Sequence, residues 1–331
     1  WRDWSSDVCS SDLEVRPVQI VNRAEPAVRP VKPNLKVNLA ISLVVGLVLG
    51  LSLAFFIEYL DTSIKTMDDV ERYLGLSVLA VIPKGAKFLT QDDPNSRFAE
   101  GYRILSAKLN LTGARESARS ITVLSGGPGE GKSTTAFNLA WVCAQSGMKV
   151  LLIDGDIRRP SVHGAVGTEN TLGLGEFLAG QASLDEQIQT SNVPNLEILT
   201  AGSLGPEDLG GFSRARFGSL LEICRPNYDV IVVDSPPVLG ISDASVISQE
   251  VDVTLLLIQH RRYPRNVSQR AKRVIDEVGG KLYGVILNNV NIKTDDNYYY
   301  YAGYSSSYYG YRKRAPRNRK ETSLPAHNFR S

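Results

Sequence analysis

The sequence predicts an α/β fold: a doubly wound, mainly parallel sheet, preceded by one transmembrane helix and followed by a disordered tail. From about Ser96 onward, helical stretches alternate with the apolar runs SITVLS, KVLLID, LEILTA, DVIVVDS, VTLLLIQ and LYGVILN. Near-continuous apolar strands separated by helices indicate a parallel sheet covered on both faces. A long uncharged apolar segment precedes these runs, and a low-complexity segment follows them.

Three segments lead up to this alternating region. Residues 1–13 show no periodicity, and we interpret them as a sequence artefact or a disordered start. Residues 14–34 contain four prolines, which fix φ and disfavour helix, so we expect an extended, extracytoplasmic strap. Residues 35–60 hold the uncharged run, which is long enough to cross roughly 30 Å of hydrocarbon as a helix. A buried helix of a soluble protein is the alternative.

The charge of the chain is concentrated at its C-terminal end. The formal net charge is +2, while residues 294–331 contain seven Lys/Arg against three Asp/Glu. The part that we expect to fold is therefore not basic, and we predict no nucleic-acid partner. The three cysteines do not have metal-ligand or redox spacing, and they imply no disulfide framework.

The strongest motif is GGPGEGKST, which runs from Gly126 to Thr134 and matches G-x-x-x-x-G-K-[ST]. It follows an apolar strand and precedes a helical run, which is the context that a phosphate-binding P-loop requires. Backbone N–H groups and the helix N-terminus then face phosphate, the lysine reaches the β- and γ-phosphates, and the serine ligates Mg²⁺. We therefore expect ATP and Mg²⁺ as cofactors of a P-loop NTPase domain.

Carboxylates follow two other predicted strands. Asp154 and Asp156 come after KVLLI, with Arg158 close behind, and Asp234 ends DVIVV ahead of two prolines. Open α/β sheets bind ligands beyond the carboxyl ends of their strands, so these side chains are expected at one phosphate site. Turn-capping carboxylates are the alternative. Asn288 and Asn289 end the last strand, where they either face the base or only form a turn.

Together, these motifs resemble the bacterial tyrosine kinases, or BY-kinases, that work with polysaccharide copolymerases in capsule and exopolysaccharide biosynthesis. The family's Walker A, Walker A′ and Walker B patterns match PGEGKST, D-x-D-x-R and DSPP here, and a tyrosine cluster follows. The apolar helix and DDVERYLGLSVLAVIP are similar to the copolymerase part that leads into the kinase. A full family member would carry a further helix and an outer domain ahead of Glu14, so this chain is expected to be a C-terminal part.

The resemblance implies roles for single residues. Lys132, Asp154, Asp156 and Asp234 are expected to be catalytic, with Asp154 as the candidate base. The metal is assigned to Ser133, Asp156 and Asp234. The nucleotide is assigned to Gly127, Pro128, Gly129, Glu130, Gly131, Lys132, Ser133, Thr134 and Arg158. The expected phosphoacceptors are Tyr298, Tyr299, Tyr300, Tyr301, Tyr304, Tyr308, Tyr309 and Tyr311.

The resemblance also implies partners. In the family, E-x-x-R-x-x-R forms an oligomer contact; Glu100 and Arg103 fit this pattern, but Ser106 stands at the third place. The expected partners are a neighbouring copy whose site accepts the tail, the membrane, polysaccharide export proteins and a tyrosine phosphatase. The domain division that follows is a juxtamembrane segment and linker at 61–95, a P-loop tyrosine kinase domain at 96–293 and a Tyr-rich, basic tail at 294–331.

Charge and chemistry disagree about membrane orientation. Basic residues precede the apolar helix and acidic residues follow it, which by the positive-inside rule would place the N-terminal side in the cytoplasm. The need for ATP favours the opposite orientation, with a single pass through the bacterial inner membrane and a cytoplasmic kinase domain.

Two other functions compete with tyrosine autophosphorylation. One is an ATPase switch of the ParA/MinD type, although such proteins usually carry a second lysine early in the P-loop, where this chain has Gly127. The other is a non-catalytic copolymerase scaffold whose nucleotide site only regulates contacts. Phosphotyrosine detection after incubation with ATP separates the three.

Overall fold

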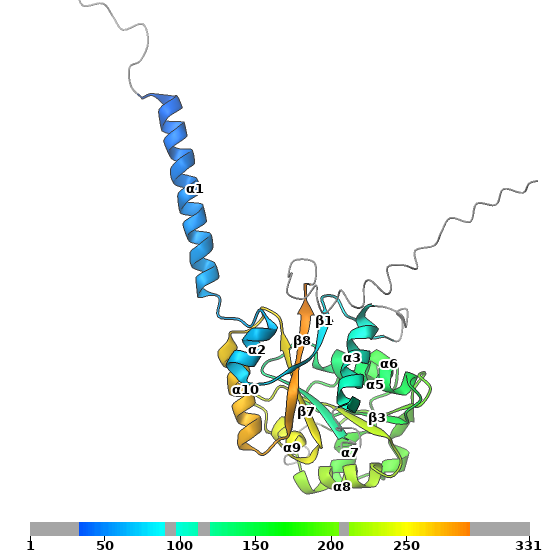
Figure 1. Cartoon of the computed structure of the whole chain (residues 1–331). Helices are drawn as coiled ribbons and strands as arrows, with labels where there is room; N and C mark the ends of the chain where they lie inside the picture. Colours follow the sequence, from blue (N-terminus) through cyan, green and yellow to red (C-terminus); the bar gives the residue numbers. More distant parts are fainter. Residues whose placement is uncertain (1–32, 90–96, 112–119, 205–211, 292–331) are drawn as a thin grey trace, which may run out of the picture. The chain divides into compact units, whose positions relative to one another are not determined.

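The computed structural model describes residues 33–89, 97–111, 120–204 and 212–291 (Figure 1). The chain divides into two compact units, Trp1–Asp61 and Thr62–Ser331. The first contains helix α1 (Leu35–Leu60), which is long and apolar enough to cross a membrane. No residue of α1 is buried among the described residues.

The second unit is built on an eight-stranded sheet with the order β1-β8-β7-β2-β6-β3-β5-β4. All neighbouring strands are parallel except β4 and β5, which are antiparallel. The predicted doubly wound, mainly parallel sheet is thus confirmed. The strands are β1 (Val78–Pro83), β2 (Ser120–Ser125), β3 (Val150–Asp154), β4 (Ile188–Thr190), β5 (Leu196–Leu199), β6 (Val230–Asp234), β7 (Val253–Gln259) and β8 (Leu282–Val290).

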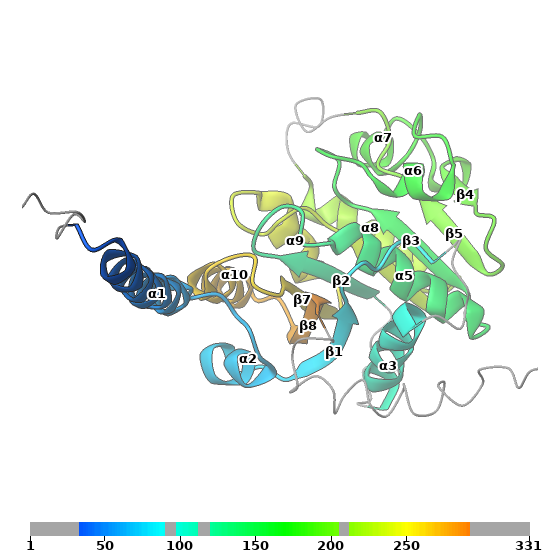
Figure 2. The same ribbon diagram turned by 90° about the horizontal axis from the view of Figure 1, so that it is seen from above.

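Helices cover both faces of this sheet (Figure 2). Alternate residues of β7 show the division: Leu255 and Leu257 pack with α3 and α5, whereas Leu256 and Ile258 pack with α2 and α10. The helices of this unit are α2 (Met67–Leu74), α3 (Arg97–Leu111), α5 (Lys132–Gln145), α6 (Val162–Val166), α7 (Leu174–Ala179), α8 (Arg214–Cys224), α9 (Ser242–Glu250) and α10 (Arg265–Glu277), with the short 3-10 helix η1 (Leu184–Glu186).

Strand β1 lies in the range that the sequence assigned to the juxtamembrane segment and linker. It pairs in parallel with β8 and is mostly buried, so the folded unit begins at Thr62 rather than at residue 96. Helix α3 packs against β1, where Gly101 allows close approach: a Cβ there would lie 3.2 Å from the carbonyl of Val81. The run LSVLAVIP is apolar and strand-like, but its partner is some 200 residues away in sequence and no local pattern identifies it.

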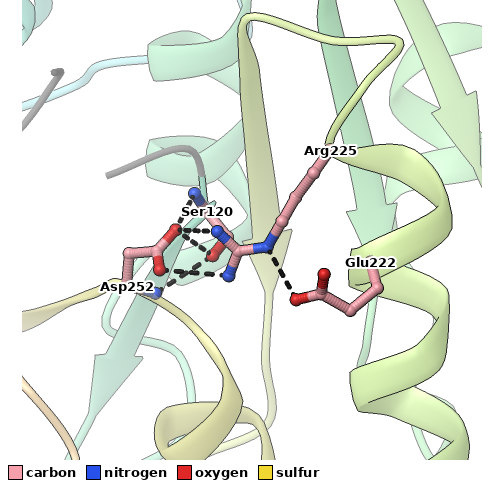
Figure 3. A network of polar contacts seen from close by, with 4 residues as sticks. All are labelled: Ser120, Glu222, Arg225 and Asp252. Atoms are coloured by element: carbon pink, nitrogen blue, oxygen red, sulfur yellow. Dashed lines mark hydrogen bonds and ion pairs between the residues drawn. The ribbon is translucent and has the colours of Figure 1, made fainter. Parts of the chain in front are cut away.

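An ion-pair cluster lies at the amino ends of the strands, which we call the amino edge of the sheet (Figure 3). Asp252, just before β7, accepts two hydrogen bonds from the guanidinium of Arg225, at 2.9 and 3.0 Å. It also accepts from the backbone N–H and the hydroxyl of Ser120, at 2.9 and 2.8 Å. The end of α8 is thereby held to the starts of β2 and β7.

Candidate functional site

The P-loop lies between β2 and α5, as the sequence predicted. Gly129 and Gly131 have φ of 72° and 100°, which is the left-handed region where glycine is favoured. Lys132 begins α5 and is buried. Burial lowers the pKa of its ammonium group, while the carboxylates of Asp234, Asp156 and Glu130 raise it. The lysine is thus surrounded by negative charge at the head of the helix.

Glu130 turns toward the protein. Its carboxylate accepts from the backbone N–H of Gly127 at 2.7 Å and from that of Gln259 at 3.0 Å. Burial raises the pKa of this carboxyl group, and the two backbone hydrogen bonds lower it. The side chain therefore holds the P-loop to the end of β7, and it is not available to contact a nucleotide in this arrangement.

Asn288, at the end of β8, also belongs to the P-loop support. Its amide donates to the backbone carbonyl of Glu130 at 2.7 Å, and its side-chain oxygen accepts from the N–H of Asn289. Asn289 has φ of 60°, in the left-handed region, and it lies within β8 where the register of that strand with β1 shifts. The sequence left open whether these asparagines face the base or only form a turn. Both lie within β8, and Asn288 supports the P-loop through its contact with Glu130.

Asp154 and Asp234 end neighbouring strands and are paired in the β3–β6 register. Asp154 is fully buried, and its oxygens accept from the backbone N–H groups of Asp156, Ser161 and Val162 at 3.0–3.3 Å. Its carboxylate therefore shapes the turn that follows β3. Burial raises the pKa of Asp154, and these backbone hydrogen bonds lower it.

Asp234 is equally buried, but neither of its oxygens has a hydrogen-bond partner of standard geometry among the described residues. Burial raises its pKa strongly and the charge of Asp154 raises it further, whereas the Ser133 hydroxyl and Lys132 lower it. A buried carboxylate whose hydrogen bonds are incomplete is costly, because it has lost its contacts with water. Such a group is expected where a ligand supplies the missing contacts.

Asp156 lies two residues past the end of β3 and is only half-buried. Its pKa is raised mainly by burial and lowered by the backbone N–H of Arg159 and by Lys132. Arg158 is 41% exposed, and its Nε donates to the buried carboxylate of Asp243 at 3.0 Å. Asp243 lies in the first turn of α9, so the predicted nucleotide residue Arg158 is held by an acidic group that the sequence interpretation missed.

Two further groups of predicted residues lie apart from this site. The tyrosines from Tyr298 to Tyr311 are outside the described residues. Glu100 and Arg103 form an ion pair with each other on α3 at 3.3 Å, both partly exposed. Ser106 is buried, with its hydroxyl 3.6 Å from the sulfur of Cys143, so the third place of the expected oligomer motif lies inside the domain.

Several supporting residues carried no sequence signal. Gln259 and Asp243, which bind Glu130 and Arg158, are distant from the P-loop along the chain and belong to no motif. Asp243 lies in the first turn of α9, the helix that follows the Walker-B pattern. This nearness along the chain was the one sequence feature that could have pointed to it. Within the described residues, no group of three or more His, Cys, Asp or Glu side chains has metal-site geometry.

The fold and the site define a P-loop ATPase-like domain, and the family model described as an AAA domain matches residues 118–283. The tyrosine-protein kinase YwqD of Bacillus subtilis is 34% identical over 213 residues, which cover 64% of this chain and 90% of that protein. The kinase domain of the Escherichia coli tyrosine kinase ETK superimposes with a TM-score of 0.64 at 30% identity, covering 68% of this chain and 93% of that one.

The chain therefore belongs to the bacterial tyrosine-protein kinase family, and protein-tyrosine kinase activity with nucleotide binding follows from that membership. A longer relative shows similarity outside the kinase domain. The putative tyrosine-protein kinase EpsB of Ralstonia solanacearum is 30% identical over 314 residues, which cover 89% of this chain and 41% of that protein.

Proposed function

We propose that this chain is an ATP-dependent tyrosine autokinase that phosphorylates its own C-terminal tyrosine cluster, with the tail of one copy entering the site of another. The observation that carries this proposal is a group of three carboxylates near the P-loop lysine. The charges of Asp234 and Asp156 raise the pKa of Lys132, and Asp154 lies beside Asp234 in the next strand. Phosphoryl transfer requires such a site, since it depends on positioning and on neutralising the charge of the phosphates.

The residues fit a Mg²⁺ ion. The Ser133 hydroxyl and the Asp234 carboxylate are the oxygen donors that Mg²⁺ prefers, and Asp234 is buried with no hydrogen bond of standard geometry among the described residues. We assign the ion to Ser133 and Asp234, with Asp156 as a third candidate ligand. When bound, Mg²⁺ would neutralise charge on the phosphates. Lys132 would contact the β- and γ-phosphates.

Acceptance of the phenol proton is better assigned to Asp156 than to Asp154. Asp154 is fully buried, and its oxygens are occupied by backbone N–H groups, whereas Asp156 is half-buried. A general base must reach the proton that it removes. Asp154 then holds the loop that carries Asp156. The P-loop backbone from Gly127 to Thr134 and Arg158 remain the proposed nucleotide contacts, with Glu130 acting through its backbone.

The proposed acceptors form a tail whose charge changes on modification. Residues 294–331 carry seven Lys/Arg and three Asp/Glu, and each phosphotyrosine adds roughly −1.5 to −2 at pH 7. The unmodified basic tail would be attracted to the acidic site of a neighbour, and the phosphorylated tail would be repelled from it. Self-association that ATP disperses is the expected result, measured by sedimentation of the full chain before and after phosphorylation. An unchanged assembly state would contradict it.

The proposed cellular setting rests on α1 and on the family. We place α1 in the bacterial inner membrane, residues 14–34 outside the cytoplasm and the kinase domain inside, with the phosphorylation cycle regulating polysaccharide export. A tyrosine phosphatase would reverse it. The surface of α3 with Glu100 and Arg103 is the proposed contact between copies.

The test uses two full-length variants. Lys132→Met removes the phosphate-binding lysine, and a second variant changes all eight acceptor tyrosines to phenylalanine. Each alone should give no phosphotyrosine with ATP and Mg²⁺. When they are mixed, phosphate should appear on the Lys132→Met chain, which is possible only in trans. Undiminished phosphorylation of Lys132→Met alone would overturn the site. ATP hydrolysis by the wild type without any phosphotyrosine would favour an ATPase switch, and neither activity would favour a scaffold.

A further inference from the structure

One segment, from Arg262 to Val267, packs against three glycines of the P-loop. A Cβ on Gly127 would lie 2.6, 2.7 and 2.9 Å from Cε2, Cζ and the hydroxyl of Tyr263. A Cβ on Gly129 would lie 2.8 Å from Nη2 of Arg262, and one on Gly126 would lie 2.8 Å from Cγ1 of Val267. The phosphate loop and the start of α10 are therefore fitted against each other without room for side chains on the loop.

The contact of Tyr263 is polar as well as steric. Its hydroxyl donates to the backbone carbonyl of Pro128 at 3.0 Å. The guanidinium of Arg262 lies 5.4 Å from the centre of the tyrosine ring and donates to the side chain of Gln259 at 3.2 Å. Gln259 is also the residue whose backbone N–H binds Glu130. Tyr263, Arg262 and Gln259 thus form a connected set of contacts between the P-loop and the end of β7.

The segment that carries Tyr263 is itself fixed from the other side. The backbone N–H groups of Arg261 and Arg265 donate to the carbonyls of Ile64 and Thr62, at 3.2 and 3.0 Å. An isolated β-bridge joins Ser63 to Pro264. Short backbone pairing on both sides of the tyrosine limits how far the ring can withdraw from the P-loop.

Gly127 differs from Gly129 and Gly131 in why it must be glycine. Its φ does not lie in the left-handed region, so the backbone at this position tolerates a side chain. What excludes a side chain is the ring of Tyr263. A lysine at this place, as in the ParA/MinD type of P-loop, could not be accommodated while the ring occupies its present position.

We propose that Tyr263 is a positioning residue for ATP: its ring takes the space of a side chain at position 127, and its hydroxyl fixes the carbonyl of Pro128, so that the following N–H groups of the loop face the phosphates. The inference rests on the proposed ATP site and adds a residue to it. The pairing of Tyr263 with Gly127 also separates this P-loop from one with a second lysine.

The experiment is a double-mutant cycle in the full chain, with ATP KM and kcat for tyrosine phosphorylation as the readouts. Gly127→Ala would push the ring aside, and Tyr263→Ala would remove it, so both lose the same contact. Each should raise the KM for ATP by about fivefold or more with kcat within twofold. The double variant should match the singles, because residues in one contact are not additive.

Two conservative variants complete the test. Tyr263→Phe keeps the ring and loses one hydrogen bond, so KM should rise about threefold to tenfold. Tyr73→Phe, on α2 and outside the P-loop, is the matched control and should leave KM unchanged. Independent, multiplying effects of the two alanine variants, or equal falls in kcat and thermal stability at constant KM, would overturn the positioning role. Activity of Lys132→Met would instead overturn the ATP site itself.

Discussion

The carboxyl and amino ends of the strands differ in how they hold their carboxylates: Asp234 is buried and Asp252 is half-buried. At the carboxyl ends of the strands, Asp234 is fully buried, and its oxygens have no hydrogen bond of standard geometry among the described residues; burial raises its pKa, more than Ser133 and Lys132 lower it. At the amino edge, burial also acts on Asp252, but hydrogen bonds from Arg225 and Ser120 outweigh it and lower the pKa. The hydrogen bonds of Asp252 stabilise the fold, whereas the carboxylate of Asp234 lacks hydrogen bonds that a ligand could supply.

The same contrast separates two arginine–aspartate pairs. Arg225 binds Asp252 through two parallel hydrogen bonds, the arrangement that gives the strongest such pairs. Arg158 binds Asp243 through Nε at 3.0 Å and is 41% exposed. The two hydrogen bonds of the pair at the amino edge fix the orientation of both side chains. The pair at the carboxyl ends of the strands leaves Arg158 partly exposed, and Arg158 is a proposed nucleotide contact.

Asp234→Asn should have the largest effect. Phosphotyrosine formation should fall by on the order of a hundredfold or more, because the proposed Mg²⁺ ligand is lost. The domain without nucleotide should become more stable by about 2 kcal/mol near pH 8, since a buried carboxylate with incomplete hydrogen bonds is replaced by a neutral amide. Kinase assays over a range of Mg²⁺ concentrations and urea unfolding measure the two effects. Lower activity together with lower stability would mean that Asp234 supports the fold.

Asp252→Asn should show the reverse pattern. Loss of the charged hydrogen bonds with Arg225 and Ser120 should lower the free energy of unfolding by about 2 kcal/mol. The KM for ATP and kcat should change less than twofold, because the cluster lies at the edge away from the P-loop. The matched control is Glu222→Gln: Glu222 is 76% exposed and 3.4 Å from Arg225, so its removal should cost less than about 0.5 kcal/mol.

The pH dependence of stability should separate the two carboxylates by sign. The raised pKa of Asp234 means that the folded state keeps a proton that the unfolded state has lost, so this group destabilises the fold increasingly as pH rises above about 4. The lowered pKa of Asp252 means that its contribution is complete above about 4 and is lost as pH falls through the lowered value.

Unfolding of both asparagine variants and the wild type, followed from pH 3.5 to 8.5, measures this difference. The stability gained in Asp234→Asn should grow with pH, and the stability lost in Asp252→Asn should be constant above pH 5 and shrink below it. Parallel curves for the two variants would contradict the assigned directions of the pKa changes.

The sequence predicted the parts of the fold and the site that local patterns control. The strands β2, β3, β6, β7 and β8 are near-continuous apolar runs, and the P-loop glycines lie between a strand and a helix, so both could be found without the structure. Strand β1 was assigned to the linker range, because its pairing with β8 depends on a contact between the two ends of the domain.

What the sequence could not supply is the direction in which side chains turn. Glu130 lies in the middle of the phosphate motif, yet its carboxylate binds Gly127 and Gln259. Asp154 was the candidate base, but its oxygens accept hydrogen bonds from backbone N–H groups of the turn after β3. We therefore propose Asp156 as the base. Tyr263 and Asp243 reach the site from the β7–α10 loop and from α9, and no spacing rule links them to the P-loop.

The smallest expected effect concerns Asp243, which lies beside both Arg158 and Asp156. Burial is the main cause of the raised pKa of Asp156, and the negative charge of Asp243 adds to it. Asp243→Asn removes that charge while keeping an oxygen that can accept from the Nε of Arg158. The pKa of Asp156 should therefore move down toward its ordinary value, while the position of Arg158 changes little.

If Asp156 accepts the phenol proton, this change has a measurable sign. The acid limb of the pH–rate profile for tyrosine phosphorylation should shift to lower pH in Asp243→Asn, because the base stays ionised further into the acid range. The KM for ATP should rise by no more than about threefold, in keeping with a partly exposed ion pair. Asp276→Asn, which breaks the exposed pair with Lys272 on α10, is the control and should shift nothing. Two outcomes would contradict Asp156 as the base: an acid limb that moves to higher pH in Asp243→Asn, or one that is unchanged there but absent in Asp154→Asn. Either would assign the base to Asp154 and leave Asp156 as a ligand of the metal or a residue that supports the loop.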